Sequence, residues 1–257
     1  MVPFFMTDRI GGERVGILNK LFRRSKPDTG FSCSAIVPAA GNSTRMGEDK
    51  LLLPLHDVPV LLWTLRALEG CPYITEIIVV TREDLIVPVG QLCREAALNK
   101  VRKVVVGGKT RTESVLAGIR EADPAAELIA IHDAARPLVT QGIINAVIEK
   151  AAERGAAAPA VPVKDTIKRA VDGVVESTPD RSSLYAVQTP QVFEHGLILG
   201  ALEKAIADDV ALTDDCSAVE RLGMPVCLTA GAYENIKLTT PEDVTVAEAI
   251  LERWGVQ

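Results

Sequence analysis

Apolar residues fall into two alternating patterns from about Ser34 onward. Short runs rich in β-branched residues predict strands, and longer segments with apolar residues three or four positions apart predict helices. Strands are predicted at 35–38, 76–80, 103–106 and 128–131, and helices at 60–68, 85–97, 111–121 and 143–153. Strands that alternate with helices of about ten residues are typical of βαβ units. We therefore expect an α/β fold whose mostly parallel sheet is flanked by helices.

Start signals mark several of the helices. Pro59 can open a helix, Thr140 can cap one, and Thr240-Pro241-Glu242-Asp243 places a cap, a proline and two first-turn acids in order. The rest of the chain predicts helices at 195–207 and 218–222, a strand at 226–229 and a last helix from 242. The sequence contains no internal repeat and no clear second domain.

Residues 159–191 interrupt this alternation of strands and helices. Two segments, 162–169 and 174–178, read as strands on either side of the turn Asp172-Gly173. A hairpin inserted between α/β units is either a surface arm or a dimerisation element. We place this arm at about 162–185.

Charge separates the first residues from the rest. Residues 1–32 are predicted to form a flexible basic extension ahead of a domain spanning 33–257. A short basic amphipathic helix at 15–26 that touches a membrane surface or a partner also fits the pattern. No secretory signal and no run long enough for a membrane span occurs. The formal charge of −6 argues against a partner such as nucleic acid. The five cysteines, without a CxxC pair, are typical of reduced core thiols in a cytoplasmic protein.

Ligands of an open parallel sheet bind beyond the carboxyl ends of its strands, so the loops after the strands are candidates for the site. Small residues at 38–47 let backbone N–H groups approach a phosphate, which Arg45 and Lys50 can neutralise. The spacing matches neither a dinucleotide fingerprint nor a Walker A loop. Gly107-Gly108 permits close approach to a base or sugar, with Ser114 nearby, but a tight turn explains these glycines equally well.

The later loops add charged groups. Asp133 suits a metal ion or substrate hydroxyls, or is a loop cap, whereas His132 is interpreted as a packed core residue. Thr213 and the two acids after it favour a helix start over a metal site. Lys237 either extends outward or projects into the cleft, and Arg136 suits a phosphate. Cations without an obvious nucleophile or strong base indicate transfer between phosphates, where positioning and charge stabilisation dominate.

Six motifs occur in one order along the chain: 38–47 with Lys50, 107–115, 132–137, 164–166, 188–191 and 235–237. Together they closely resemble the 2-C-methyl-D-erythritol 4-phosphate cytidylyltransferases of the non-mevalonate isoprenoid pathway, over about residues 34–254. The resemblance implies a Rossmann-like fold of the nucleotide-diphospho-sugar transferase type, with a hairpin arm that clasps a second subunit. It also implies transfer of CMP from CTP to methylerythritol phosphate, with release of pyrophosphate and with Mg²⁺ as cofactor.

The resemblance assigns roles to individual residues. Arg45 and Lys50 would stabilise the charge that builds around the α-phosphate, and Arg181 and Lys237 would hold the attacking phosphate. The methylerythritol end would be lined by Asp133, Arg136, Thr166 and Thr213. Cytidine would be held by Ala39, Ala40, Gly41, Asn42, Gly107, Gly108 and Ser114. Magnesium would bind mainly through CTP phosphates, and no protein ligand is assigned to it.

The chain departs from the family pattern at three points: Ser43 replaces a common glycine, Lys109 stands where an acid is usual, and the arm is about two residues short. The nearest alternative is a cytidylyltransferase for another polyol phosphate such as ribitol 5-phosphate. A second is a catalytically inactive nucleotide-binding regulator, against which the presence of both Arg45 and Lys50 argues. A nicotinamide-dependent dehydrogenase is excluded because the GxGxxG fingerprint is absent.

Overall fold

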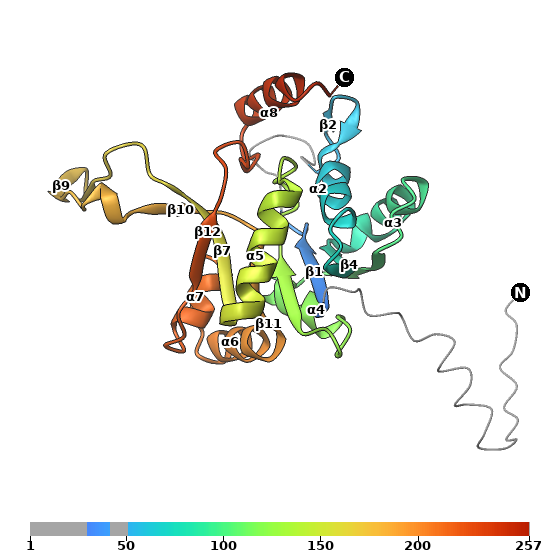
Figure 1. Ribbon diagram of the computed structural model, residues 1–257, viewed down its shortest axis with the longest axis horizontal. Helices are drawn as coiled ribbons and strands as arrows, with labels where there is room; N and C mark the ends of the chain where they lie inside the picture. The colour runs from blue at the N-terminus through green and yellow to red at the C-terminus, as the bar shows by residue number, and fades with distance from the viewer. Residues whose placement is uncertain (1–29, 42–50, 257) are drawn as a thin grey trace, which may run out of the picture.

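The computed structural model describes residues 30–41 and 51–256, and Figure 1 shows them around one twisted sheet. Asn42, Ser43, Arg45 and Lys50 lie outside the described residues, as does the extension up to residue 29. The sheet order is β10-β7-β11-β6-β1-β4-β5, and β12 pairs with β7. Its strands are β1 (Cys33–Pro38), β4 (Ile74–Thr81), β5 (Val101–Val106), β6 (Leu128–Ile131), β7 (Ala156–Pro162), β10 (Tyr185–Val187), β11 (Gln191–Glu194) and β12 (Cys227–Ala230).

Most of the sheet is parallel, as predicted. Strand β1 pairs in parallel with both β4 and β6, and β4 pairs in parallel with β5. The antiparallel part comprises β11 with β6 and β7, and β10 with β7. The chain passes from β1 outward to β5 and then returns to β6 on the other side of β1. This reversal creates a topological switch point at the carboxyl ends of β1 and β6.

Helices cover both faces because side chains of successive strand residues point to opposite sides. Ala35 and Val37 of β1 pack in one core cluster, and Ile36 between them packs in the other. The first face is covered by α2 (Val60–Glu69), α3 (Ile86–Glu95, after the 3₁₀ turn Glu83–Leu85) and α5 (Gln141–Arg154). The second is covered by α4 (Arg111–Arg120), α6 (His195–Ala207) and α7 (Asp215–Glu220). The predicted α/β fold is confirmed.

A smaller apolar cluster lies beside the switch point. The last helix, α8 (Pro241–Arg253), packs Leu251 against Leu238 and against Leu55 of the short hairpin β2 (Pro54–Leu55) and β3 (Val58–Pro59). The helix begins as predicted, with Thr240 at the N-cap in a capping box. This cluster anchors the segment that carries Lys237.

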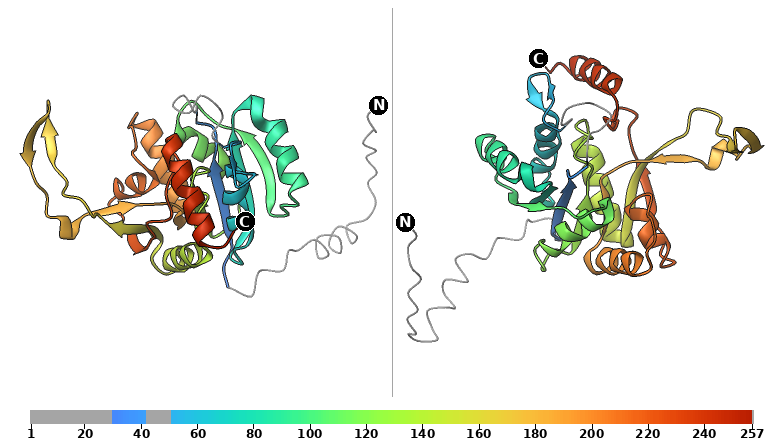
Figure 2. Two further views of the ribbon diagram at one scale, coloured as in Figure 1. Left: turned by 90° about the horizontal axis from the view of Figure 1, so that it is seen from above. Right: turned by 180° about the vertical axis from the view of Figure 1, so that it is seen from behind.

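The inserted arm extends away from the body, as Figures 1 and 2 show. It contains the hairpin β8 (Arg169–Val171) and β9 (Val174–Ser177) and a 3₁₀ turn at Arg181–Ser183. Asp172 (φ 49°) and Gly173 (φ 79°) make the predicted two-residue turn, because two successive positive φ values match the twist of the strands. The strand predicted over 162–169 is wrong, since residues 163–168 are irregular. Pro162 belongs to β7 of the main sheet, the Val163 N–H bonds to the Leu184 oxygen, and the exposed residues 164–168 pair with no strand.

Two further differences concern the second half of the chain. Strands β7, β10 and β11 were not predicted, and the helix expected at 218–222 instead runs from Asp215 to Glu220. All five cysteines lie among the described residues as free thiols, and four are buried, so the interpretation as core thiols is confirmed for those four. Among the described residues, no helix has the length and apolar character that a membrane span needs.

Candidate active site

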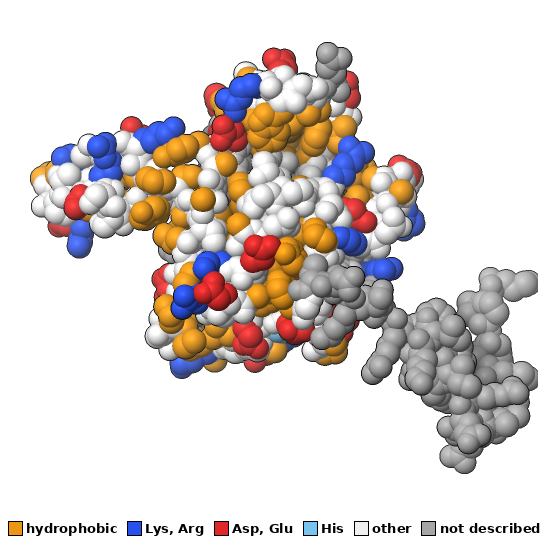
Figure 3. Space-filling view, in the orientation of Figure 1, with side chains coloured by type: hydrophobic (Ala, Val, Ile, Leu, Met, Phe, Trp, Pro, Cys, Tyr) orange, Lys and Arg blue, Asp and Glu red, His pale blue; other side chains and the backbone are white. Residues whose placement is uncertain are grey.

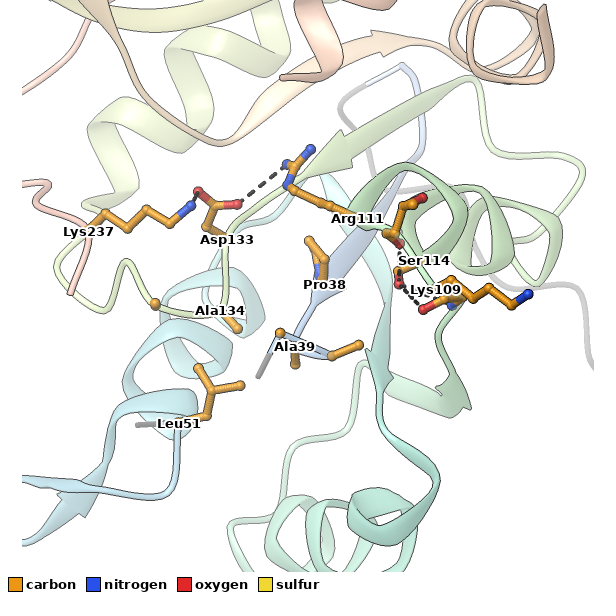
Figure 4. A pocket seen from close by; sticks show the side chains of 14 residues that line it. Pro38, Ala39, Leu51, Lys109, Arg111, Ser114, Asp133, Ala134 and Lys237 are labelled. Carbon is orange, nitrogen blue, oxygen red and sulfur yellow. Dashed lines mark hydrogen bonds and ion pairs between the residues drawn. The ribbon is translucent and has the colours of Figure 1, made fainter. Parts of the chain in front are cut away.

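A cavity of about 270 Å³ opens at the switch point (Figure 4). Three loops after parallel strands form most of it, and Lys237 enters from the segment before α8. Its lining consists of Pro38, Ala39, Ala40, Gly41, Leu51, Gly108, Lys109, Thr110, Arg111, Ser114, Asp133, Ala134, Ala135 and Lys237. Ligands of open α/β sheets bind at this position, so the fold itself places the candidate site here.

Hydrogen bonds at the start of α4 shape the glycine loop. The Ser114 hydroxyl accepts a hydrogen bond from the Gly108 N–H (3.1 Å) and donates one to the Thr110 carbonyl (2.9 Å). Thr110 and Glu113 form a capping box. The Glu113 carboxylate therefore also accepts hydrogen bonds from the backbone N–H groups of Lys109 and Thr110. The loop is held by its own helix before any ligand arrives.

The two glycines serve close packing. A Cβ on Gly107 would lie 2.7 Å from Ser114 Oγ and 2.9 Å from Ala40 Cβ, and one on Gly108 would lie 2.3 Å from Glu113 Cβ. Neither glycine has a positive φ, so the turn alone does not require them. Their small size brings the loop after β1 against the start of α4. That contact fixes one wall of the cavity.

Charged groups converge on Asp133 at the other wall. Its carboxylate lies 2.9 Å from Lys237 Nζ, 3.4 Å from Arg111 Nη2 and 3.6 Å from Arg136 Nε. Burial by itself would raise the pKa of the Asp133 carboxyl, but the charges of Lys237 and Arg111 outweigh burial and lower the pKa to about 2. Asp133 is therefore ionised at neutral pH. Figure 4 shows Lys237 and Arg111 reaching it from opposite sides.

Arg111 is a site residue to which sequence reasoning gave no role. Its guanidinium binds Asp215 through two hydrogen bonds, Nη1 to Oδ1 (2.9 Å) and Nη2 to Oδ2 (2.6 Å), while its Nη2 also reaches Asp133. The Asp215 side chain is only 1% exposed. Burial raises the pKa of Asp215, and the charge of Arg111 opposes that rise. The expected helix start is confirmed, since Asp214 is the N-cap and accepts a hydrogen bond from the Ser217 N–H, and Asp215 lies in the first turn, where it also pairs with Arg111.

Arg136 lies behind the cavity. Its side chain is 13% exposed, and its Nη1 donates a 2.7 Å hydrogen bond to the backbone oxygen of Asn235. It thus holds the segment that carries Lys237. The exposed Thr213 lines a separate hollow formed by residues 210–213, 217, 220 and 221. The structure does not bring Thr213 to the cavity.

The arm residues are also distant from this cavity within one chain. Thr166 is exposed on the arm, and Arg181 donates a hydrogen bond from Nη1 to the Lys164 oxygen (2.7 Å). Neither residue lines the cavity.

Residues 33–253 match the family model of 2-C-methyl-D-erythritol 4-phosphate cytidylyltransferase. The chain belongs to this family. It is 48% identical to the cytidylyltransferase of Desulforamulus reducens over 85% of this chain and 95% of that one, and 46% identical to that of Caldanaerobacter subterraneus over 87% and 100%. The family assignment makes this chain a nucleotidyltransferase.

Solved structures of cytidylyltransferases share the fold. The 4-diphosphocytidyl-2C-methyl-D-erythritol synthase of Anaerococcus prevotii superposes with a TM-score of 0.79 at 33% identity, over 87% of this chain and 97% of that one. The cytidylyltransferase of Thermus thermophilus superposes with a TM-score of 0.71 at 30% identity, over 84% and 98%.

The structure brings together seven of the family residues expected from sequence. Those that line the cavity are Ala39, Ala40, Gly41, Gly108, Ser114, Asp133 and Lys237, with Gly107 packed behind them. Asn42, Arg45 and Lys50 follow Gly41 along the chain and lie outside the described residues. His132, the residue before Asp133, is fully buried, which confirms its interpretation as a core residue.

Proposed function

We propose that this cytidylyltransferase transfers CMP from CTP to 2-C-methyl-D-erythritol 4-phosphate and releases pyrophosphate. The observation that carries the proposal is the cavity at the switch point, where a small-residue loop faces Asp133 and Lys237, in a chain of this family. A phosphate oxygen of the acceptor forms a bond to the α-phosphorus of CTP. The bond from that phosphorus to the bridging oxygen breaks, and its electron pair leaves with pyrophosphate.

The two walls of the cavity suit the two substrates, CTP and the acceptor phosphate. Small residues at 39–41 and Gly108 leave room for a base and sugar, with backbone groups available for hydrogen bonds. The Lys237 ammonium, held at 2.9 Å from Asp133, suits the acceptor's phosphate and hydroxyl groups. The loop that carries Arg45 and Lys50 follows Gly41, and we assign these two cations to the α-phosphate.

The reaction needs no general base from the protein. A phosphate monoester has a second pKa of about 6 and is largely a dianion at neutral pH, so it can attack directly. The nearest histidine, His132, is fully buried, and both of its ring nitrogens are engaged in hydrogen bonds. What the protein contributes is positioning and charge stabilisation.

Magnesium fits this donor set as an ion held mainly by the triphosphate. Mg²⁺ usually keeps several waters and binds one or two carboxylates together with substrate phosphates. Among the described cavity residues Asp133 is the one carboxylate, and cations already surround it. The described residues contain no group of three or more metal-binding side chains. Magnesium would supply charge neutralisation on the phosphates.

We also propose that the arm binds a second copy of the chain. Val171, Val174 and Val175 on its hairpin are 51%, 70% and 54% exposed. An isolated two-stranded hairpin is only marginally stable, and exposed apolar side chains gathered on it are typical of a surface that binds a partner. Figure 3 shows further apolar side chains where the arm meets the body. In such a dimer Thr166 and Arg181 would act at the partner's cavity.

The dimer is tested by Val174→Asp with Val87→Asp as the matched control, since Val87 is 72% exposed on α3. Val174→Asp should yield monomers in size-exclusion chromatography with light scattering and lose most activity, while Val87→Asp should remain dimeric. Full activity of dilute monomers contradicts the proposal.

The activity is tested by pyrophosphate release from purified protein with CTP, Mg²⁺ and either methylerythritol phosphate or ribitol 5-phosphate. Release should require methylerythritol phosphate, and equal or faster turnover of ribitol 5-phosphate would overturn the assignment. Lys237→Met should lower kcat/KM by about 10²-fold, a typical loss for removal of one charge-stabilising donor. Lys150→Met, which alters a half-buried lysine of α5 that does not line the cavity, should leave kcat/KM unchanged.

A further inference from the structure

The His132 imidazole lies fully buried directly behind Asp133. Its Nε2 is 3.2 Å from the backbone oxygen of Arg136, and its Nδ1 is 3.0 Å from Thr189 Oγ1. A backbone carbonyl can only accept a hydrogen bond, so Nε2 must carry the proton in this geometry. The ring therefore donates at one end of the turn that runs from Asp133 to Arg136.

The Thr189 hydroxyl fixes the other nitrogen. Thr189 Oγ1 accepts a hydrogen bond from the Asp133 N–H at 3.1 Å, so its own proton is free to point at Nδ1. The three hydrogen bonds therefore run in one direction. The Asp133 N–H donates to the Thr189 hydroxyl, the hydroxyl donates to Nδ1, and Nε2–H donates to the Arg136 carbonyl. Both ends of the turn are thus attached to one neutral ring, and the turn is closed by the Arg136 N–H on the Asp133 oxygen (3.0 Å).

The same turn holds Lys237 along three paths. Asp133 binds its ammonium, Arg136 donates to the Asn235 oxygen, and the Ala135 oxygen accepts the Leu238 N–H at 2.8 Å. The turn therefore fixes the backbone on both sides of Lys237, at Asn235 two residues before it and at Leu238 directly after it. A shift of the turn would move the ammonium.

We propose that His132, as the neutral Nε2–H tautomer, is a positioning residue that sets the Asp133–Arg136 turn and through it the place of Lys237. This inference rests on the proposed function for its kinetic readout, but the tautomer itself does not depend on that function. His132 acts through Asp133 and Lys237 and contacts no substrate. Burial, the main cause, lowers the pKa of His132 to about 4, which keeps the ring neutral at pH 7.

The first test is a spectrum of the unmodified protein. In ¹⁵N-histidine-labelled protein at pH 7, His132 should show a pyridine-like Nδ1 and a pyrrole-like Nε2, assigned by the signal that disappears in His132→Gln. A protonated Nδ1, in the neutral or the charged ring, would overturn the proposal. This result stands whether or not methylerythritol phosphate is the acceptor, so failure of the proposed function remains distinguishable.

The second test separates positioning from general damage. Thr189→Val keeps the shape of the side chain and removes the hydroxyl between Asp133 and His132. Because misplacement by about 1 Å can cost 10²-fold, we expect kcat/KM for methylerythritol phosphate to fall by about 10- to 100-fold. The KM for CTP should change less than about threefold.

The matched control is Thr75→Val, which removes a half-buried threonine hydroxyl bonded to the Cys33 oxygen at the opposite end of the sheet. It should leave both kinetic parameters unchanged. Unchanged kinetics in Thr189→Val, or equal losses toward CTP and the acceptor, would contradict the proposal. In His132→Gln the amide N–H₂ can still donate to Arg136, so partial retention of kcat/KM relative to His132→Leu is the expected rescue.

Discussion

The ion pair between the half-buried Arg111 and the buried Asp215 gives the sharpest stability prediction. In Arg111→Met the Asp215 carboxylate, 1% exposed, loses two charge-assisted hydrogen bonds of 2.9 and 2.6 Å. Asp133 loses one cation but keeps Lys237. The variant leaves an uncompensated charge in the core, which typically costs about 3–5 kcal/mol of the free energy of unfolding.

Removing both charges should cost much less than removing one. In Arg111→Met/Asp215→Leu the buried charge is gone and apolar groups of similar size fill the space, an exchange that is often neutral. The pH dependence of the single variant follows from the same reasoning. Without Arg111, the pKa of folded Asp215 rises further above the unfolded value of about 3.9, so the folded state binds the extra proton. The destabilisation should therefore be largest at neutral pH and shrink as the pH falls.

Urea denaturation monitored by circular dichroism at pH 7 and pH 5 measures both effects. Arg102→Met, on an exposed position of β5, is the matched control and should lie within about 0.5 kcal/mol of the unmodified protein. A loss below about 1 kcal/mol in Arg111→Met would refute the reasoning. So would a double variant as unstable as the sum of its single variants, because the two groups would then be uncoupled.

Two further predictions concern the glycine loop and the buried ring. Gly107→Ala should cost about 1–3 kcal/mol by overpacking and raise the KM for CTP, whereas Gly200→Ala, with open space on α6, should be neutral or stabilising in the same urea assay. His132, facing Asp133 and Arg136, has a folded pKa of about 4 against about 6.5 unfolded, so stability should fall by about 2–3 kcal/mol from pH 7 to pH 4.5. Retention of that full pH dependence in His132→Gln would contradict this attribution.

The parallel half of the sheet could be predicted because its strands are rich in β-branched residues, and β1, β4 and β6 are also buried on both faces. Strand β7 lacks that signal, since its sequence is AAAPAVP. It is a strand because β12 and β11 pair with it and helices cover it, which are contacts between distant parts of the chain. The arm shows the opposite case. Its residues have strand-like composition, but after Val163, whose N–H still bonds to the Leu184 oxygen, the exposed residues 164–168 pair with no strand.

The same distinction between local signals and contacts across the chain applies to the candidate site. Residues in loops that follow predicted strands could be placed together, because parallel strands end at one edge of the sheet. The bond between Arg111 and Asp215 joins positions 104 residues apart, and neither residue has a local signal for it. Arg136 was expected to bind phosphate because of its charge. Its burial against the Asn235 oxygen depends on how the segment before α8 returns to the turn.

Two cations of the described cavity are already paired with carboxylates, which limits how much phosphate charge they can neutralise. Lys237 and Arg111, the cavity cations nearest Asp133, already face its carboxylate, and Arg111 also binds Asp215. Arg136 reaches Asp133 from behind the cavity. Lys237, 41% exposed, can add a phosphate on its open side without leaving Asp133, so that no reorganisation precedes binding. A triphosphate and an acceptor phosphate of nearly −2 charge need more cations than this. Arg45 and Lys50 are the nearest in sequence to the wall formed by Ala39–Gly41, so the affinity for CTP should depend on them more than on any described lysine or arginine.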